Sequence, residues 1–111
     1  MPHSTIIDEN DITIQLEWQS APMVSQMTWK AALDSCRALT TSDYSNWRLP
    51  TIEEIQSIMA SGTIELTDKE LWSRCSSSGN YINADAIDEN NNITSVQKTE
   101  VKFVLACRII N

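Results

Sequence analysis

The sequence predicts an α+β fold in which two helices pack on one side of a mostly antiparallel sheet. Three features lead to this prediction: a strand of alternating apolar residues near the N-terminus, two segments with one apolar helical face each, and several strand-like segments after them. The chain has 111 residues, so we expect one domain that spans residues 1–111. A domain of this size buries roughly two-thirds of its unfolded surface, which is enough for a modest core.

The N-terminal part is expected to hold strands and then a helix. A polar lead-in contains a short strand at Thr5–Ile7. Apolar and polar side chains alternate over Ile12–Trp18, which is typical of a half-buried strand. Thr28 is expected to cap a first helix that ends at Leu39 or Thr40, because the apolar residues after it recur at helical spacing.

The segment NWRLPTIEEIQSI, residues 46–58, combines an apolar anchor with the start of a second helix. Its proline favours an extended approach to the helix. Thr51 and Glu54 have the spacing of a capping box. We therefore expect a helix over Ile52–Ala60, with Gly62 as its C-cap.

Arg48 lies between the large apolar residues Trp47 and Leu49. A guanidinium in such a place needs a partner, because a buried unpaired charge is costly. One interpretation makes Arg48 a ligand-binding residue. We prefer a structural ion pair with Glu54, or with Glu53, that fixes the turn into the second helix.

The C-terminal half is expected to be mostly strands, preceded by a polar segment over 63–70 with one further helical turn. Its last part is apolar throughout Phe103–Cys107, which indicates a central strand covered on both faces. The expected elements are a short apolar segment at Leu71–Arg74, a turn at Ser76–Asn80, a hairpin of Tyr81–Ile87 and Ile93–Gln97 with its turn at Asp88–Asn92, and a last strand at Val101–Ile110.

The chain is acidic, with a formal charge of −7 and a pI of about 4.5. We therefore expect neither nucleic acid nor an anionic membrane as partner, since both are bound by basic patches. No apolar run approaches the roughly 20 residues of a membrane span. The N-terminus lacks the basic and apolar regions of a signal peptide, so we expect a cytosolic protein or one whose signal was removed.

Catalytic and metal-binding patterns are not found in the sequence. His3 is the sole histidine, so a Ser/His/Asp or Cys/His nucleophilic centre is not expected. Two glycines cannot build a phosphate-binding loop, and we expect no cofactor. Asp85 and the residues of Asp88–Asn92 could offer oxygens to Ca²⁺, but a solvated hairpin turn explains them better, so no metal site is expected.

The four tryptophans lie in segments with core periodicity, so we expect them to pack in the core and not to stack on sugars. A ligand surface would then come from the loops at 63–70 and 76–92. The candidate surface residues are Tyr81, Asn83, Asp85, Asn90 and Asn91.

The pattern W-R-L-P-T-x-x-E, residues 47–54, resembles the bacterial domain found at the C-terminus of Legionella collagen-like adhesins. Its R-L-P-T-x-x-E core is also similar to a segment of formylglycine-generating enzymes, which share the C-type-lectin-like fold. The resemblance runs from about Ile7 to Ile109. The other residues that carry it are Thr13, Leu16, Glu17, Trp18, Gln19, Trp29, Ala32, Cys36, Leu71, Trp72, Ser73, Cys107 and Arg108.

The resemblance implies a C-type-lectin-like fold with paired N- and C-terminal strands. We expect Cys36, on the inward face of the first helix, to face Cys107 in the last strand, with Cys75 apart from both. Such domains commonly join these two elements by a disulfide, and in the cytosol the pair would remain adjacent thiols. The chain departs from the family at Cys75, where W-S-S-T is usual, and at Ala106, where an arginine usually precedes Cys107.

The sugar-binding calcium motifs of C-type lectins and the catalytic cysteine region of formylglycine-generating enzymes are both absent. We therefore interpret the chain as a non-enzymatic domain that binds a ligand, a protein or a polysaccharide, in an exported or surface-associated bacterial protein. One alternative is a cytosolic interaction or immunity-type protein whose acidic surface binds a basic partner. Another is an oxidase related to formylglycine-generating enzymes.

Overall fold

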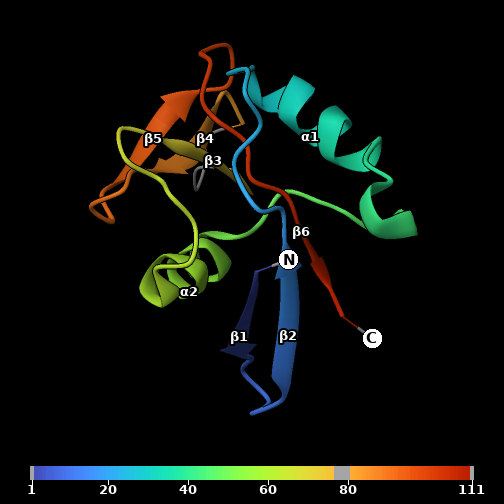
Figure 1. Ribbon diagram of the computed structural model, residues 1–111. Coiled ribbons are helices and arrows are strands. Elements are labelled where there is room, and N and C mark those ends of the chain that lie inside the picture. The colour runs from blue at the N-terminus through green and yellow to red at the C-terminus, as the bar shows by residue number, and fades with distance from the viewer. Residues whose placement is uncertain (1, 77–80, 111) are drawn as a thin grey trace.

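The computed structural model describes residues 2–76 and 81–110, so the turn expected at Ser76–Asn80 lies largely outside the described residues. Two helices and six strands form an α+β fold, which confirms the expected class (Figure 1). In chain order the elements are β1 (His3–Ile7), β2 (Thr13–Trp18), α1 (Trp29–Arg37), the 3-10 turn η1 (Thr41–Asp43), α2 (Ile52–Ser61), β3 (Leu71–Ser76), β4 (Asn83–Ile87), β5 (Ile93–Gln97) and β6 (Cys107–Ile109).

The strands form two antiparallel sheets, with the orders β1-β2-β6 and β3-β4-β5, where one sheet was expected. β2 pairs with β6, so Leu16 lies opposite Ile109 and Trp18 opposite Cys107. The expected pairing of the strands near the two ends of the chain is therefore confirmed, and β1 occupies the other edge of β2. The helix α2 contacts β1 of one sheet and β3 and β4 of the other, whereas α1 packs against β3.

The two hairpins share one type of turn and one short sequence, I-D-E-N, at residues 7–10 and 87–90. In each turn the aspartate Oδ1 accepts backbone N–H groups two and four residues on, all at 2.9 Å: Asp8 in the first turn and Asp88 in the second. The fourth turn residue has a left-handed backbone, with φ of 59° at Asp11 and 67° at Asn91. The expected turn at Asp88–Asn92 is confirmed, and the same chemistry acts at Asp8. The strand before Asp8 begins at His3 and is therefore longer than the strand expected at Thr5–Ile7.

The helix boundaries follow their caps. Thr28 caps α1, which ends at Arg37, earlier than expected, and the following turn continues with the Leu39 N–H bonded to the Cys36 carbonyl at 3.2 Å. The capping box at α2 is present, and Gly62 ends that helix with φ of 66°.

The helical turn expected in residues 63–70 does not form. The segment is a loop whose side chains Ile64 and Leu66 are buried in the core.

The expected strand Val101–Ile110 is wrong in its extent, because only β6 is regular. Successive side chains nevertheless alternate between two hydrophobic cores: Leu105 and Cys107 lie in what we call the first core, and Val104 and Ala106 in the second core. The carbonyl of Val104 accepts from the Met23 N–H at 2.8 Å, so a loop supplies the partners that a neighbouring strand would have supplied. The segment is covered on both sides, as expected, without being part of a continuous ladder.

The four tryptophans pack as expected. Trp18, Trp47 and Trp72 are buried, and Trp29 is partly buried against the second core. Each indole N–H donates to an atom of the protein: to Ser4 Oγ, and to the carbonyls of Ser73, Thr41 and Met27. These rings connect the elements through packing and hydrogen bonds.

Candidate functional site

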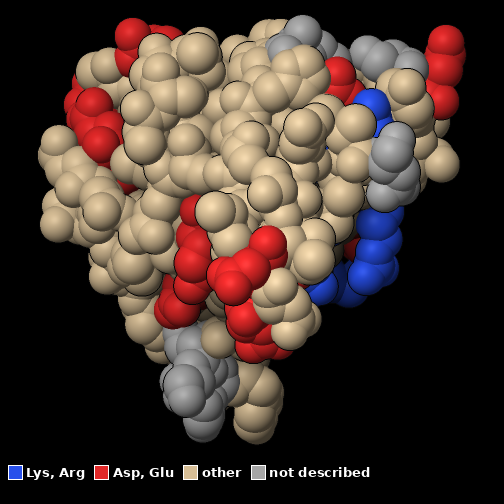
Figure 2. All heavy atoms as spheres, turned by 90° about the horizontal axis from the view of Figure 1, so that it is seen from below, with Lys and Arg blue, Asp and Glu red and all other residues tan. Residues whose placement is uncertain are grey.

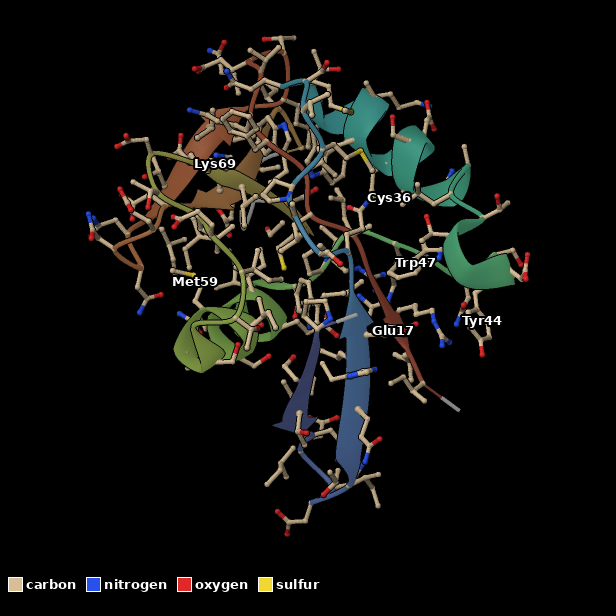
Figure 3. All side chains as sticks on the ribbon, viewed as in Figure 1. Glu17, Cys36, Tyr44, Trp47, Met59 and Lys69 are labelled. Carbon is tan, nitrogen blue, oxygen red and sulfur yellow. The ribbon has the colours of Figure 1, made fainter. Side chains whose placement is uncertain are left out.

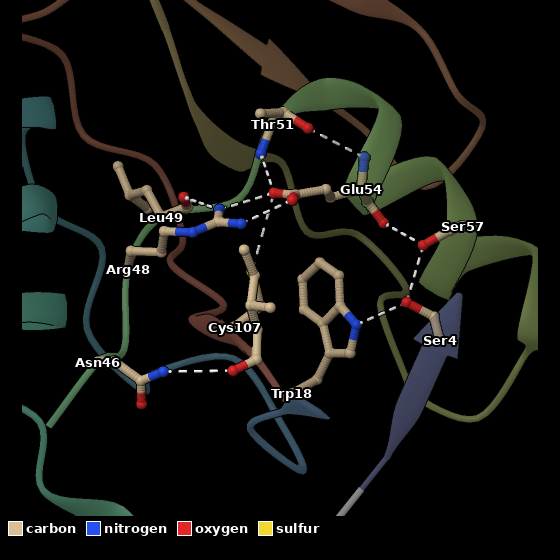
Figure 4. A network of polar contacts seen from close by, with 10 residues as sticks. Ser4, Trp18, Asn46, Arg48, Leu49, Thr51, Glu54, Ser57 and Cys107 are labelled. Carbon is tan, nitrogen blue, oxygen red and sulfur yellow. Dashed lines mark hydrogen bonds and ion pairs between the residues drawn. The ribbon is translucent and has the colours of Figure 1, made fainter. Parts of the chain in front are cut away.

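Arg48 and Glu54 form a two-pronged ion pair at the entrance to α2 (Figure 4). Arg48 Nη1 donates to Glu54 Oε1 and Nη2 to Oε2, both at 2.7 Å. Glu54 Oε1 also accepts the Thr51 N–H at 2.8 Å, and the Cys107 thiol lies 3.9 Å from it. Burial alone would raise the pKa of Glu54, but the bonds from Arg48 and Thr51 outweigh burial and hold that pKa below its usual value.

The ion pair is connected to the first sheet by hydroxyl groups. Ser57 donates to the Glu54 carbonyl at 2.6 Å, and its Oγ lies 2.8 Å from Ser4 Oγ in β1. Ser4 Oγ accepts from the Trp18 indole at 2.8 Å (Figure 4). The pair therefore lies at the junction of α2, β1 and β2, where its polar groups are all satisfied.

A second feature lies beside this ion pair: a pocket of about 120 Å³ that we call the arginine pocket. It is lined by Arg37, Arg48, Arg74, Leu33 and Leu49. Three of the eight Lys and Arg residues of the chain thus lie around one small cavity.

Three elements bring these arginines together. Arg37 lies in the last turn of α1, one helical turn after Leu33. Arg74 lies in β3, and its N–H donates to the Pro50 carbonyl at 2.7 Å, which fixes β3 beside the segment that carries Arg48. The convergence is therefore a product of the tertiary fold.

The charges around the arginine pocket are not balanced. Arg48 is paired with Glu54, and this hydrogen bond raises the pKa of Arg48 above its usual value. Within residues 2–76 and 81–110, neither Arg37 nor Arg74 has a carboxylate at ion-pair distance. The pocket therefore carries a local positive surplus in a chain whose formal charge is −7.

The family model of the Lcl C-terminal domain matches residues 8–106, which is most of the chain. The chain belongs to the Lcl C-terminal domain family. A comparison with curated proteins found no match. Among the residues described for this Lcl C-terminal domain, no helix has the length and apolar character needed to cross a membrane.

The cysteines of this Lcl domain are free thiols. Cys36 projects from α1 into the second core (Figure 3), and Cys107 belongs to the first core. Burial raises the pKa of each to about 12. Cys75 is half-buried against the first core. That Cys36 and Cys107 face each other stays a prediction.

The surface residues expected from the loops lie at opposite ends of β4. Tyr81 precedes the strand and is 85% exposed. Asn83 and Asp85 lie within β4, where the Asn83 amide donates to Ser95 Oγ at 3.1 Å. Asn90 and Asn91 lie in the turn after β4, so the structure does not bring the five residues into one site.

The turn after β4 borders an acidic pocket of about 290 Å³. Asn91 Oδ1 accepts from Gln56 of α2 at 2.9 Å, whereas Asn90 lines the pocket. Its other lining residues are Asp68, Lys69, Glu70, Asp88 and Glu89. Within the described part of the chain, no group of His, Cys, Asp and Glu is arranged to hold a metal ion.

Arg108, by contrast with Arg37 and Arg74, is fully engaged. Its Nε donates to Glu17 Oε1 at 2.6 Å across the β2–β6 pair, and its guanidinium lies 3.4 Å from the centre of the Tyr44 ring. Tyr44 covers this pair from beside β6 (Figure 3). Arg108 and Tyr44 border a cleft of about 400 Å³, but the positive charge of Arg108 is already paired with Glu17.

Sequence reasoning found Arg48 but missed Arg37 and Arg74 as parts of one pocket. The three residues are separated by 11 and 26 positions, and no spacing rule relates them. The available signal was weak: Arg37 follows the inward-facing Cys36, and Arg74 lies in the segment expected at Leu71–Arg74.

Proposed function

We propose that this chain is a non-enzymatic ligand-binding domain, with a C-type-lectin-like fold, of an exported or surface-associated bacterial protein. The arginine pocket is the binding site, and it takes an anionic group of the ligand. The observation that carries the proposal is that Arg37 and Arg74 line one pocket beside the paired Arg48, and that neither has a carboxylate partner within the described residues.

The chemistry of guanidinium supports an anion. Arginine offers a planar set of donors that matches carboxylate, sulfate and phosphate oxygens. Placing like charges around one cavity is unfavourable until an anion neutralises them. Since Arg48 is held by Glu54, the donors of Arg37 and Arg74 remain for the ligand.

The charge of the remaining surface supports a small ligand group and not a polyanion. On the face shown in Figure 2, acidic atoms lie at the upper left, in the middle and at the upper right, whereas the basic atoms gather on the right side. A formal charge of −7 would repel a long polyanion. A single anionic group can still bind at the pocket, because salt screens charges that are farther away than about a Debye length.

The environment of the buried thiols supports a binding role over an oxidase role. A nucleophilic cysteine needs a low pKa, whereas burial raises the pKa of both Cys36 and Cys107 to about 12. A thiol in that state is a poor nucleophile near neutral pH.

The proposal is tested by NMR titration of the ¹⁵N-labelled protein with acetate and with inorganic sulfate. We expect saturable shifts at the amides of Arg37, Leu49 and Arg74, and their loss in the Arg37→Gln/Arg74→Gln double variant. The control is Lys30→Gln, which removes one positive charge from the exposed face of the same helix. Shifts that are unchanged in the double variant would refute binding at this pocket.

The alternative of an acidic interaction surface has one observation in its favour, the acidic pocket of Asp68, Glu70, Asp88 and Glu89. A basic peptide such as oligolysine would then shift the amides of these residues, whereas the Arg37→Gln/Arg74→Gln variant would bind it equally well. If oligolysine did not shift the amides of the acidic pocket and only anions caused shifts, at the arginine pocket, this alternative would be excluded.

A further inference from the structure

The size of the arginine pocket limits what it can hold. Sites for whole drug-sized ligands have volumes of roughly 300–1,000 Å³. The arginine pocket has about 120 Å³, which limits it to a small end group such as a carboxylate with a short aliphatic branch. The rest of a larger ligand would remain outside the cavity.

The walls of the pocket are of two kinds. Arg37, Arg48 and Arg74 supply positive charge, and Leu33 and Leu49 supply an apolar surface. Leu49 is only 1% exposed and belongs to the extended segment before α2. Leu33 lies on α1 and packs partly against the second core.

This combination favours a carboxylate over sulfate or phosphate. A carboxylate presents two oxygens in one plane, which match the guanidinium donors, and its third substituent is carbon. Sulfate and inorganic phosphate have polar oxygens on every side, and those facing the leucines would lose hydration without a new partner. An aliphatic group on the carboxylate would instead cover the apolar wall.

We propose that the pocket binds a carboxylate carried by a small branched aliphatic group. This proposal rests on the proposed function, because it names the ligand class of the same site. The carboxylate could come from a free short-chain acid or from the C-terminal leucine of a peptide, and both present the same group. Arg37 and Arg74 bind the carboxylate, and Leu33 and Leu49 contact the aliphatic branch.

Calorimetric titrations with matched small molecules test the ligand class. We expect 4-methylpentanoate to bind about tenfold more tightly than acetate, because it also buries an aliphatic branch. The neutral 4-methylpentanamide should bind at least about tenfold more weakly than the acid, since it lacks the charge. 4-Methylpentanoate as a free acid and a leucine-terminated peptide distinguish the two sources, and tight binding of either one supports the shared chemistry.

Two outcomes are decisive and differ in what they overturn. Binding of acetate or inorganic phosphate as tightly as 4-methylpentanoate, with loss in the Arg37→Gln/Arg74→Gln variant, would overturn the aliphatic carboxylate and leave the proposed function intact. Failure of every anion to bind at the pocket would overturn both.

A variant of the apolar wall separates contact with the branch from simple charge attraction. Leu33→Ala should lower the affinity for 4-methylpentanoate several-fold, and by a larger factor than it lowers the affinity for acetate. Lys30→Gln should change neither affinity, because Lys30 lies on the same helix but does not line the pocket. An equal loss for both acids in Leu33→Ala, in a variant whose thermal unfolding shows that it is folded, would contradict the proposal.

Discussion

Arg48 donates to both carboxylate oxygens of Glu54 at 2.7 Å, and this pair joins the extended segment before α2 to the first turn of that helix. The pair is well buried: the side chain of Arg48 is 26% exposed and that of Glu54 is 5% exposed. Arg48 lines the arginine pocket, but its charge is paired with the carboxylate of Glu54.

Arg48→Ala is expected to lower the free energy of unfolding by about 3 kcal/mol, because it leaves the Glu54 carboxylate buried without its partner. Urea unfolding followed by tryptophan fluorescence measures the change. Arg37→Ala, which removes an exposed arginine from the same pocket, is the control and should cost little. An unchanged midpoint of thermal unfolding in Arg48→Ala would contradict the structural role of the ion pair.

The ion pair also predicts a dependence of stability on pH. The folded-state pKa of Glu54 lies below its usual 4.5, so the ionised carboxylate stabilises the fold fully above about that pH. This contribution is lost as the pH falls through the folded-state pKa, because the unfolded chain takes up the proton first. Glu54→Gln should therefore be less stable at pH 7 and should lose less stability on acidification.

Equilibrium unfolding at several pH values between 7 and about 2.5 makes this measurement. Glu53→Gln removes an exposed carboxylate from the same helical turn and serves as the control. Parallel losses of stability in the wild type and in Glu54→Gln would show that this carboxylate is not responsible.

The three thiols should differ in reactivity. Cys36 and Cys107 are buried with pKa values of about 12, so they remain protonated at pH 8 and out of reach of reagents. Cys75 is half-buried, and iodoacetamide should modify it first in the folded protein. Timed alkylation followed by peptide mass spectrometry tests this order, which equal rates at all three cysteines would contradict.

Under oxidising conditions, we expect any disulfide to join Cys36 and Cys107. The bridge would close a loop of about 70 residues and stabilise the fold by roughly 4 kcal/mol in the chain-entropy model. Peptide mapping of the oxidised protein identifies the linkage, and Cys75→Ser should leave it unchanged. A linkage that includes Cys75 would show that the pairing is wrong.

Local chemistry accounts for the parts of the fold that the sequence predicts well. The capping box, the C-cap at Gly62 and the turn at Asp88 each depend on residues within a few positions of one another. The turn at Asp8 has the same I-D-E-N sequence and could have been found in the same way. Sequence patterns could therefore locate these elements before the structure did.

Features that depend on distant segments were not predictable in this way. Apolar periodicity does not say that the strands divide into two sheets, nor that the loop before α1 takes the place of a strand beside Val104. The arginine pocket needs α1, β3 and the segment before α2 to meet, and only the tertiary fold determines that meeting. The sequence interpretation of Arg48 as a choice between structure and binding missed this possibility.

The most direct test of the central claim is to observe which methyl groups the bound ligand touches. We would record intermolecular nuclear Overhauser effects between 4-methylpentanoate and the methyl-labelled protein. The predicted result is a set of cross-peaks from the ligand methyl groups to Leu33 and Leu49, which line the arginine pocket. Cross-peaks to Leu66, which lines a separate pocket with Glu65 and Glu89, without any to Leu33 or Leu49, would contradict it.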